Sequence, residues 1–349
     1  MLEIDGSQGE GGGQLLRSAL SLSLITAKPF RITRIRSNRS KPGLMRQHLV
    51  AVQAAGRICG AELSGAELGS SALSFEPRRV RPGSYSFDIG SAGSTPLVLQ
   101  TVIPPLLLAE APSRLTLTGG THVPFSPSWQ YLAEVFAPTL RRLGGVVELA
   151  QDSCGFYPKG GGKVRCGIEP AAALQPIDAQ TRGRLLRIRG YSVVAQLPLS
   201  IAERQSRAAL ERLRASLGAG VPIELVSREC RSIGPGTFLF LKGEYESALS
   251  GCTALGARGK PAEQVGEEAA LEFLQHHDTG QPVDPHLADQ LVLYLALAAG
   301  PSLFATSRIT GHLLANLELV GSFLELEVRV TGAPGGPGTV GITPKGARP

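Results

Sequence analysis

The alternation of apolar and polar residues predicts a strand, a turn and a helix at the start of the chain. Leu2 and Ile4 alternate with polar neighbours, as in a half-buried strand. An apolar run from Leu15 to Ile25 has the length of a helix, and the glycine-rich stretch Asp5 to Arg17 joins the two. Exposed backbone N–H groups and the positive end of the helix dipole would point the same way at this junction. We therefore expect an anion site there, with phosphate as the ligand.

The same order of elements recurs along the chain. The first unit continues with a strand at 30–36, a helix at 44–59 and two short strands near 61–63 and 73–75. A second unit runs from Ser84 to Ile168, and a weaker third from Asp284 to Val330. Between them, roughly from 180 to 275, the pattern changes to separate strands and long helices. Such periodicity indicates repeats of one structural unit.

These units predict the domain organisation. We expect an α/β (α+β) fold in which three β-α-β-α-β-β units form one large domain, residues 1–180 and 276–331. A small α/β domain, residues 181–275, would be inserted before the third unit. The remaining residues, 332–349, are rich in glycine and proline with little to bury, so we expect a flexible tail.

Composition narrows the class of protein. Hydrophobic residues at 42% and charged residues at 18% indicate an ordered soluble protein. No apolar run is clean and long enough to span a bilayer and no secretory signal is visible, so we expect no membrane association. Five cysteines without a C-x-x-C pair favour reduced thiols in a cytoplasm over a structural zinc site. The net charge of +6 fits an acidic partner such as nucleic acid.

Glu10 stands among the four glycines of the first turn, where a carboxylate and a phosphate would repel each other. A hard cation such as magnesium takes carboxylates together with phosphate oxygens. Glu10 is therefore a candidate metal ligand beside a nucleoside triphosphate. A solvated loop carboxylate is the alternative.

The glycine turns match neither of two familiar nucleotide motifs. The chain has no G-x-x-x-x-G-K-[ST], and the first turn does not satisfy G-x-G-x-x-G. A second glycine run, Cys154 to Val164, precedes a strand instead of a helix. Glycines in that position permit a bulge or a close backbone contact.

Several motifs in the right order resemble the RNA 3'-terminal phosphate cyclase family. The family signature R-G-x-x-P-x-G-G-G-x-V matches Cys154 to Val164 except at its first position. The N-terminal block D-G-x-x-G-E-G-G-G-Q-x-L-R matches Asp5 to Arg17 in full. The resemblance spans nearly the whole chain except the tail, and the family's fold is similarly three repeats with a small inserted domain. Further matches are Lys41 to Leu49, Gly90 to Ser94, Gly119 to Thr121 and Leu287 to Leu291.

The resemblance implies an enzyme of the ligase class that uses ATP and a divalent cation, magnesium or manganese. AMP would pass from ATP to an active-site histidine and then to an RNA 3'-phosphate, after which the 2'-hydroxyl closes a 2',3'-cyclic phosphate and AMP leaves. The family's H-L-L-x-N block, which holds the nucleophile, is His312 to Asn316 here. Neutral imidazole is a competent nucleophile, although a histidine at a helix start can also be a cap or a surface residue. Of the other histidines, His276 and His277 are expected to be structural, and His48 and His122 have no partner at metal-ligand spacing.

The resemblance also implies a set of nucleotide-binding residues. His286 stands where family members often carry a tyrosine that stacks on adenine, and its ring would stack less extensively. Gln100 could instead bond a neighbouring helix, Pro127 could be an ordinary loop proline, and Asp289 and Gln290 could cap the following helix. The complete set is Gln100, Pro127, His286, Leu287, Ala288, Asp289 and Gln290.

Four residues are candidates for binding phosphates and the RNA 3'-phosphate end. Arg17, Arg36, Arg39 and Gln47 lie in loops and helix starts that would face the first glycine turn. Arginine forks suit phosphate oxygens. Because aromatic residues are only 5% of the chain, recognition of a terminus is a simpler hypothesis than binding of a long single strand. Whether the chain forms a homodimer stays open.

Two other functions remain as alternatives. One is a cyclase-like binding protein of ribosome assembly that keeps the fold without the chemistry; His312 together with Glu10 argues against it. The other is a transferase of the enolpyruvyl type, which would bind a phosphorylated small molecule without forming an adenylate. Labelled ATP distinguishes both from a cyclase.

Overall fold

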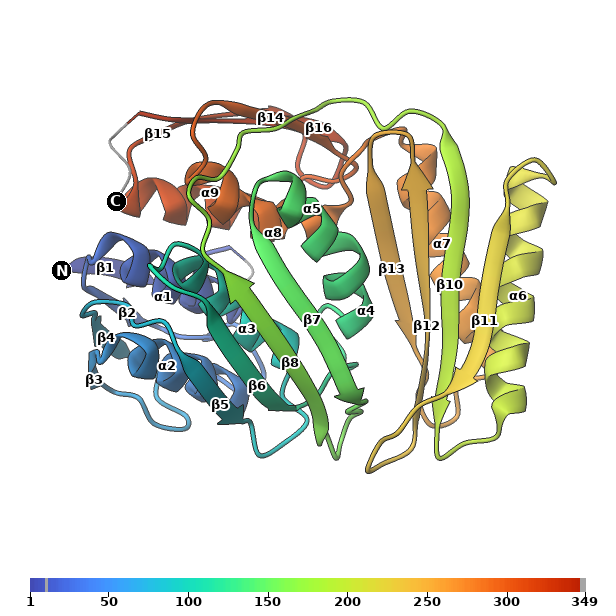
Figure 1. Cartoon of the computed structure of the whole chain (residues 1–349), viewed down its shortest axis with the longest axis horizontal. Coiled ribbons are helices and arrows are strands. Elements are labelled where there is room, and N and C mark those ends of the chain that lie inside the picture. The colour runs from blue at the N-terminus through green and yellow to red at the C-terminus, as the bar shows by residue number, and fades with distance from the viewer. Residues whose placement is uncertain (10–11, 346–349) are drawn as a thin grey trace.

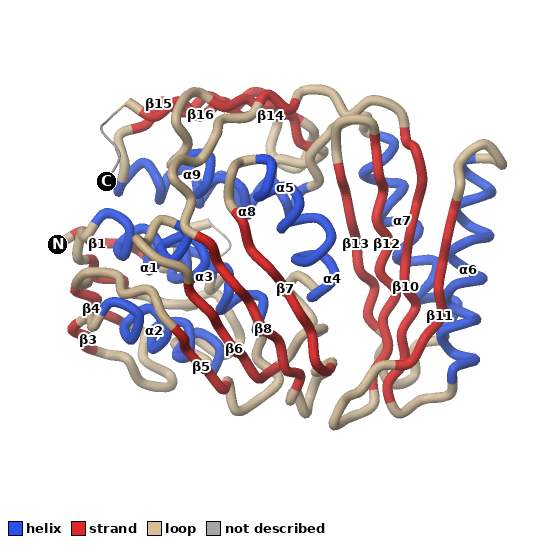
Figure 2. Tube along the Cα trace, viewed as in Figure 1, coloured by secondary structure: helices blue, strands red, loops and turns tan. Residues whose placement is uncertain are grey.

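The computed structural model describes residues 1–9 and 12–345, and it has an α/β architecture (Figure 1). Within these residues the strands form four sheets of four strands each. Three sheets surround a central group of helices, and the fourth stands to one side, at the right of the view (Figure 2). The predicted α/β class is therefore confirmed. Every helix in the described ranges is too short or too polar to span a bilayer.

The first sheet comes from the N-terminal part of the chain. Its elements are β1 (Leu2–Asp5), α1 (Gln14–Thr26), β2 (Phe30–Thr33), α2 (Arg46–Cys59), β3 (Glu62–Ser64) and β4 (Leu73–Glu76). The strand order is β1-β2-β4-β3, with β1 and β2 parallel and the other neighbours antiparallel. Buried Phe30 and Ile32 alternate with exposed Arg31 in β2, so the sheet turns one apolar face toward the helices.

The second sheet repeats this pairing. Its elements are β5 (Ser84–Asp88), α3 (Thr95–Leu107), β6 (Ser113–Gly119), α4 (Trp129–Tyr131), η1 (Leu132–Phe136), α5 (Ala137–Arg142), β7 (Val146–Ser153) and β8 (Gly162–Glu169). The order is β5-β6-β8-β7, again with one parallel and two antiparallel pairs. The helical stretch from Trp129 to Arg142 contains a π-helical segment, η1.

The third sheet is assembled from two separate parts of the chain. Its elements are β9 (Asp178–Ala179), α8 (Pro285–Ala296), β14 (Ser302–Thr306), α9 (Gly311–Phe323), β15 (Leu326–Gly332) and β16 (Gly338–Pro344). Read from β9, the order β9-β14-β16-β15 has the pairing of the other two sheets. The intervening segment thus interrupts this unit instead of preceding it. A two-residue strand is too short to show an apolar period, which is why the sequence did not reveal β9.

The expectation of a flexible tail from residue 332 is wrong for most of that segment. Gly338 to Pro344 forms β16, which lies between β14 and β15 and pairs with both. Val340 and Ile342 are fully buried, so the strand contributes to the core despite its glycines and proline. Residues 346–349 lie outside the described part of the chain.

The segment between β9 and α8 folds as a unit that we call the insertion, Leu185 to Asp278; the rest of the chain is the body. Its elements are β10 (Leu185–Ala195), α6 (Leu199–Leu217), β11 (Ile223–Glu229), β12 (Gly236–Tyr245), β13 (Leu249–Leu255) and α7 (Ala262–Asp278). The strand order is β11-β10-β12-β13. Leu239 and Leu241 face the helices and share a hydrophobic cluster with them, whereas Phe238 and Phe240 belong to the core of the body. β13 was not predicted, because its small residues show no clear alternation of apolar and polar side chains.

Candidate active site

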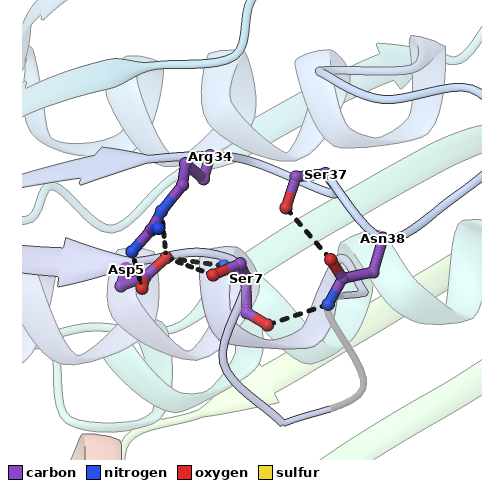
Figure 3. Close-up of polar contacts among 5 residues, drawn as sticks. All are labelled: Asp5, Ser7, Arg34, Ser37 and Asn38. Carbon is purple, nitrogen blue, oxygen red and sulfur yellow. Dashed lines mark hydrogen bonds and ion pairs between the residues drawn. The ribbon is translucent and has the colours of Figure 1, made fainter.

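The first glycine turn begins at a carboxylate that is held on several sides (Figure 3). Asp5 Oδ1 accepts hydrogen bonds from the Ser7 N–H at 2.9 Å and the Ser7 hydroxyl at 2.6 Å, and the Arg34 guanidinium binds the same carboxylate. The Ser7 bonds, followed by Arg34, lower the pKa of Asp5. Asn38 Nδ2 donates to the Ser7 carbonyl at 3.0 Å. The loop after β2 is therefore fastened to the start of the turn.

The glycine turn lies directly against the start of α9. A methyl group placed on Gly9 would lie 2.9 Å from Ala315 Cβ. One placed on Gly12 would lie 3.2 Å from Arg39 Nη2 and 3.8 Å from His312 Cε1. The fold thus brings the predicted nucleophile and one of the predicted phosphate-binding arginines to the predicted anion site.

The start of α9 is fixed by hydrogen bonds to α8 and α1. The Thr310 hydroxyl caps the helix, accepting from the Leu313 N–H at 2.9 Å and donating to Asp289 Oδ1 at 2.6 Å. Asn316 Nδ2 donates to the Asp289 carbonyl at 3.1 Å, and Asn316 Oδ1 accepts from the Ser18 hydroxyl at 2.9 Å. Through these bonds Asp289 and Asn316 hold the start of α9, the helix that carries the predicted nucleophile His312.

A buried histidine closes the other side of the glycine turn. A methyl group on Gly13 would lie 2.2 Å from His48 Nε2 and 2.9 Å from Arg17 Nη1. His48 Nδ1 accepts from the Met45 N–H at 3.2 Å, so its proton is on Nε2. Burial, then Arg17 and Arg36, lower the pKa of His48 to about 3. The imidazole is therefore neutral, and its Nε2 lies beside Gly13 of the turn.

Positive charge is concentrated around this histidine. Burial lowers the pKa of Arg17 to about 10. Burial and the neighbouring Arg39 lower the pKa of Arg36, whose Nη1 donates to the carbonyls of Lys41 at 2.6 Å and Gly43 at 3.0 Å. Holding like charges together costs free energy that an anion can offset. The three arginines predicted to bind phosphate are thus gathered beside the first turn.

The fourth predicted phosphate-binding residue lies at the second turn. Gln47 Oε1 accepts from the Ser94 N–H at 3.0 Å, and Ser94 caps α3 by accepting from the Leu97 N–H at 3.3 Å. Gln100 is half-buried on the same helix, which contacts α8. On α8, Gln290 Oε1 is buried and has no hydrogen-bond partner within the described residues. A buried acceptor of this kind is suited to a donor on a ligand.

The predicted adenine segment starts at a capped helix end. Asp284 Oδ1 accepts from the N–H groups of His286 and Leu287, both at 3.0 Å, and from the Tyr131 hydroxyl at 2.7 Å. His286 Nε2 lies 3.5 Å from Glu272 Oε1 of the insertion, and its ring meets Tyr131 edge-on. Hydrogen bonding to Glu272 raises the pKa of His286. The insertion therefore reaches the segment that is expected to bind the nucleotide.

The remaining predicted site residues are Pro127, Ala288 and Glu10. Pro127 is half-buried in the loop before α4, next to Ser128, whose hydroxyl bonds the Thr253 hydroxyl of the insertion at 2.8 Å. Ala288 is buried in α8. Glu10, the predicted metal ligand, lies outside the described residues. Within the described ranges no three histidine, cysteine or acidic side chains form a group that could hold a metal ion.

Several contributors to this site were not predicted from the sequence. No partner was expected for His48, because the contact joins a glycine and a histidine on different elements. No role was assigned to Tyr131, Asp284 or Glu272. The side-chain-free position Gly13, followed by an arginine one helical turn later, is the signal that could have pointed to a close neighbour.

The second glycine run holds the insertion on the body. A methyl group on Gly236 would lie 2.1 Å from Phe156 Cγ, and one on Gly161 would lie 2.3 Å from Ile233 Cδ1. The Lys159 ammonium donates to the Ile233 carbonyl at 3.4 Å. The expected close backbone contact is therefore present, and its partner is the loop between β11 and β12 of the insertion.

The family model and the similar proteins that match this chain carry the same family name. A family model described as RNA 3'-terminal phosphate cyclase matches residues 8–330. Proteins named RNA 3'-terminal phosphate cyclase are similar along almost the whole chain. One from Methylococcus capsulatus is 46% identical over 98% of this chain and 96% of its own, and one from Ignicoccus hospitalis is 45% identical over 95% of each. A third, from Koribacter versatilis, is 44% identical over 95% of this chain and 92% of its own. The chain therefore belongs to the RNA 3'-terminal phosphate cyclase family.

Proposed function

We propose that this protein is an ATP-dependent RNA 3'-phosphate cyclase of the ligase class. It would convert an RNA 3'-phosphate into a 2',3'-cyclic phosphate and release pyrophosphate and AMP. Family membership supports the overall activity. The observation that carries the chemistry is the position of His312 at the start of α9, beside the glycine turn.

In the first step a ring nitrogen of His312 attacks the α-phosphorus of ATP, and the bond to the pyrophosphate oxygen breaks. An oxygen of the RNA 3'-phosphate then attacks the same phosphorus and releases the histidine. Finally the 2'-hydroxyl attacks the 3'-phosphorus, loses its proton, and AMP leaves. The positive helix N-terminus and the nearby arginines would stabilise the charge on the phosphoryl oxygens in each step.

We assign the nucleotide to the first turn of α8, residues 286–290, together with Gln100 and Pro127. The unsatisfied Gln290 Oε1 supports this assignment, since the amino group of adenine is a donor that would complete its hydrogen bonding. Asp289 would orient the α9 start through Thr310. His286 would offer its ring edge or face to the base in place of tyrosine.

We assign the RNA 3'-phosphate to the cationic cluster of Arg17, Arg36 and Arg39, with His48 donating from Nε2. Arg17 and Arg39 support this assignment, because both side chains lie beside the glycine turn. Burial, and then the neighbouring Arg39, lower the pKa of Arg36, so these two guanidinium groups are close together. Gln47 would act mainly by positioning the second turn, because its amide oxygen already accepts a hydrogen bond from the Ser94 N–H.

A divalent cation, magnesium or manganese, would neutralise the triphosphate and polarise the attacked phosphorus. We propose Glu10 as its carboxylate ligand, with the remaining positions filled by phosphate oxygens and water. Magnesium commonly keeps several waters and needs only one or two carboxylates, which fits a chain without a preformed acidic cluster in its described ranges.

We further propose that the body consists of three repeats of one unit, the third of which is interrupted by the insertion and ends with β16, and that the protein works in the cytoplasm. The matching strand orders of three sheets support the repeats. The separate hydrophobic cluster supports the inserted domain.

The test is incubation of purified protein with α-labelled ATP and magnesium. Wild type is expected to gain acid-labile, alkali-stable label, and His312→Ala is expected to gain none. The matched control is His277→Ala, because this histidine stacks on Tyr245 in the insertion. Absence of label on wild type, even with manganese and an RNA 3'-phosphate, would contradict the proposal and favour a binding protein.

A further inference from the structure

Two large aromatic side chains are exposed on neighbouring loops of the body. Among the described residues, Phe125 and Tyr157 are the only phenylalanine, tyrosine or tryptophan residues with exposed side chains. Phe125 lies in the loop between β6 and α4, and Tyr157 lies in the loop between β7 and β8. The His122 N–H of the first loop donates to the Gly155 carbonyl of the second at 3.1 Å. The backbone therefore holds the two loops together.

The backbone at Phe125 disfavours a side chain of this size. Its φ of +60° lies in the left-handed region, where a bulky residue is an outlier. The phenyl ring is fully exposed, so it adds nothing to the core. The loop is nevertheless fixed, because the Ser126 hydroxyl donates to the Val123 carbonyl at 3.0 Å. An exposed ring that is held outward on a strained backbone is typical of a residue that contacts a ligand.

A third loop adds positive charge beside these rings. The β11–β12 loop of the insertion meets the β7–β8 loop at the lower edge of the view (Figure 1), where Ile233 contacts the position of Gly161. Lys159 and Arg231 are exposed, and neither side chain makes an ion pair within the described ranges. The three loops contain no carboxylate. We call their exposed residues the loop surface, which consists of Phe125, Tyr157, Lys159, Arg231 and Ile233.

The second turn connects the loop surface to the candidate active site. A methyl group on Gly160 would lie 2.4 Å from the Ser91 carbonyl oxygen, so the β7–β8 loop touches this turn. One on Gly93 of the same turn would lie 2.9 Å from Gln47 Cβ. Gln47 precedes His48 in α2, and His48 lies against the first glycine turn. Direct contacts therefore link the proposed RNA 3'-phosphate site to the loop surface.

We propose that the loop surface binds the single-stranded RNA that precedes the 3'-phosphate, with bases stacked on Phe125 and Tyr157. This proposal rests on the proposed function, which makes RNA the substrate. Every base has a π-face, so such stacking accepts any sequence. Lys159 and Arg231 attract the phosphates of the RNA backbone. A second copy of this chain is a poorer occupant, because its net charge of +6 would be repelled by a surface of the same sign.

The test measures the binding of a fluorescent single-stranded RNA with a 3'-phosphate by anisotropy, in the absence of ATP. Phe125→Ala and Tyr157→Ala should each weaken binding by about 5- to 150-fold, the usual effect of removing one stacking partner. Phe125→Trp should retain binding, and Phe125→Leu should lose it, because stacking requires a ring. Leu186→Ala is the matched control, since this exposed residue stands at the opposite end of β10 from the β11–β12 loop.

Phe125→Gly separates binding from folding. Glycine accepts the positive φ, so stability in urea should stay equal or rise, while RNA binding should fall as in Phe125→Ala. Variants that bind RNA as tightly as wild type would overturn the proposal. If the same variants instead dissociated a dimer, the surface would be a subunit contact; if they reduced adenylation only at limiting ATP, it would belong to the nucleotide site. Absence of label from α-labelled ATP on wild type contradicts the enzymatic function, whereas unchanged RNA binding contradicts the loop surface alone.

Discussion

The contact between Gly13 and His48 makes a quantitative prediction about the glycine turn. In Gly13→Ala the new methyl group would lie 2.2 Å from His48 Nε2, where ordinary contact needs at least 3.4 Å. The backbone of Gly13, at φ −82° and ψ 0°, accepts alanine, so the cost arises from crowding. His48 is buried and bonded to the Met45 N–H, and displacing it would break that bond. Crowding of about 1–3 kcal/mol and a lost bond of about 1 kcal/mol predict a total loss of about 2–4 kcal/mol.

The assay is urea denaturation of four proteins: wild type, Gly13→Ala, His48→Ala and the double variant. In the His48→Ala background the methyl group meets no imidazole, so the Gly13 substitution should cost much less there. Gly321→Ala on α9 is the matched control, because a methyl group there meets nothing within 4 Å. That control should be neutral or stabilising by about 0.5–1 kcal/mol.

The same variant tests the function of the turn. Displacement of His48 and Arg17 from the proposed RNA 3'-phosphate site should raise the concentration of RNA 3'-phosphate that the folded variant needs for cyclisation. An equal cost of Gly13→Ala with and without the imidazole would refute the steric reasoning. An unchanged dependence of cyclisation on the RNA 3'-phosphate concentration in a folded Gly13→Ala protein would refute the assignment of this site to the RNA 3'-phosphate.

Three further perturbations test other parts of the structure. Ile342→Ala in β16 should lose about 2–5 kcal/mol of unfolding free energy, because this side chain is fully buried. Thr343→Ala on the same strand is the control and should lose less than about 1 kcal/mol. Equal effects in urea denaturation would show that the strand is not part of the core. Burial lowers the pKa of His122 to about 4. As pH falls, the His122 imidazole therefore binds a proton in the unfolded chain before it does so in the folded protein. Up to about 3 kcal/mol of stability should be lost between pH 6.5 and 4. Denaturation of His122→Asn should show a smaller loss over that range, and an identical pH dependence would contradict the buried neutral imidazole. Glu272→Gln should lower the pKa of His286 toward its ordinary value in an NMR titration, because the partner that raises it is gone, and an unchanged pKa would exclude that ion pair.

Local signals were sufficient to predict the start of the fold. The alternation in Leu2 to Ile4, the glycines and the apolar run from Leu15 specify a strand, a turn and a helix that need few distant contacts. The strands β9 and β16 were not predicted, because each is defined by its partner β14 and not by its own residues. Burial of Val340 and Ile342 outweighs the local preference of their glycine-rich surroundings.

In the candidate site, too, some features could be predicted from the sequence and others could not. Motif resemblance supplied His312 and Arg17, since both residues stand in recognisable runs. Arg36 and Arg39 were predicted from their position in a loop expected to face the first glycine turn. Their mutual arrangement depends on pairs from different elements, such as Thr310 with Asp289 and His48 with Gly13. No single run of sequence contains both members of such a pair, and so their hydrogen bonds and pKa values required the folded structure.

The interrupted third sheet has a consequence for the order of folding. β9 pairs with β14 although the entire insertion separates Asp178 from Leu303, and closing so long a loop is entropically costly and slow. Arg182 Nη2, just before the insertion, donates to the His277 carbonyl near its end at 2.6 Å, so the two ends of the insertion lie close together. If the insertion folds first, only residues 179–181 and 278–302 remain in the effective loop between the paired residues of β9 and β14. During synthesis the body would then stay incomplete, with α9 and its predicted nucleophile undocked, until the insertion has folded and β16 has emerged last.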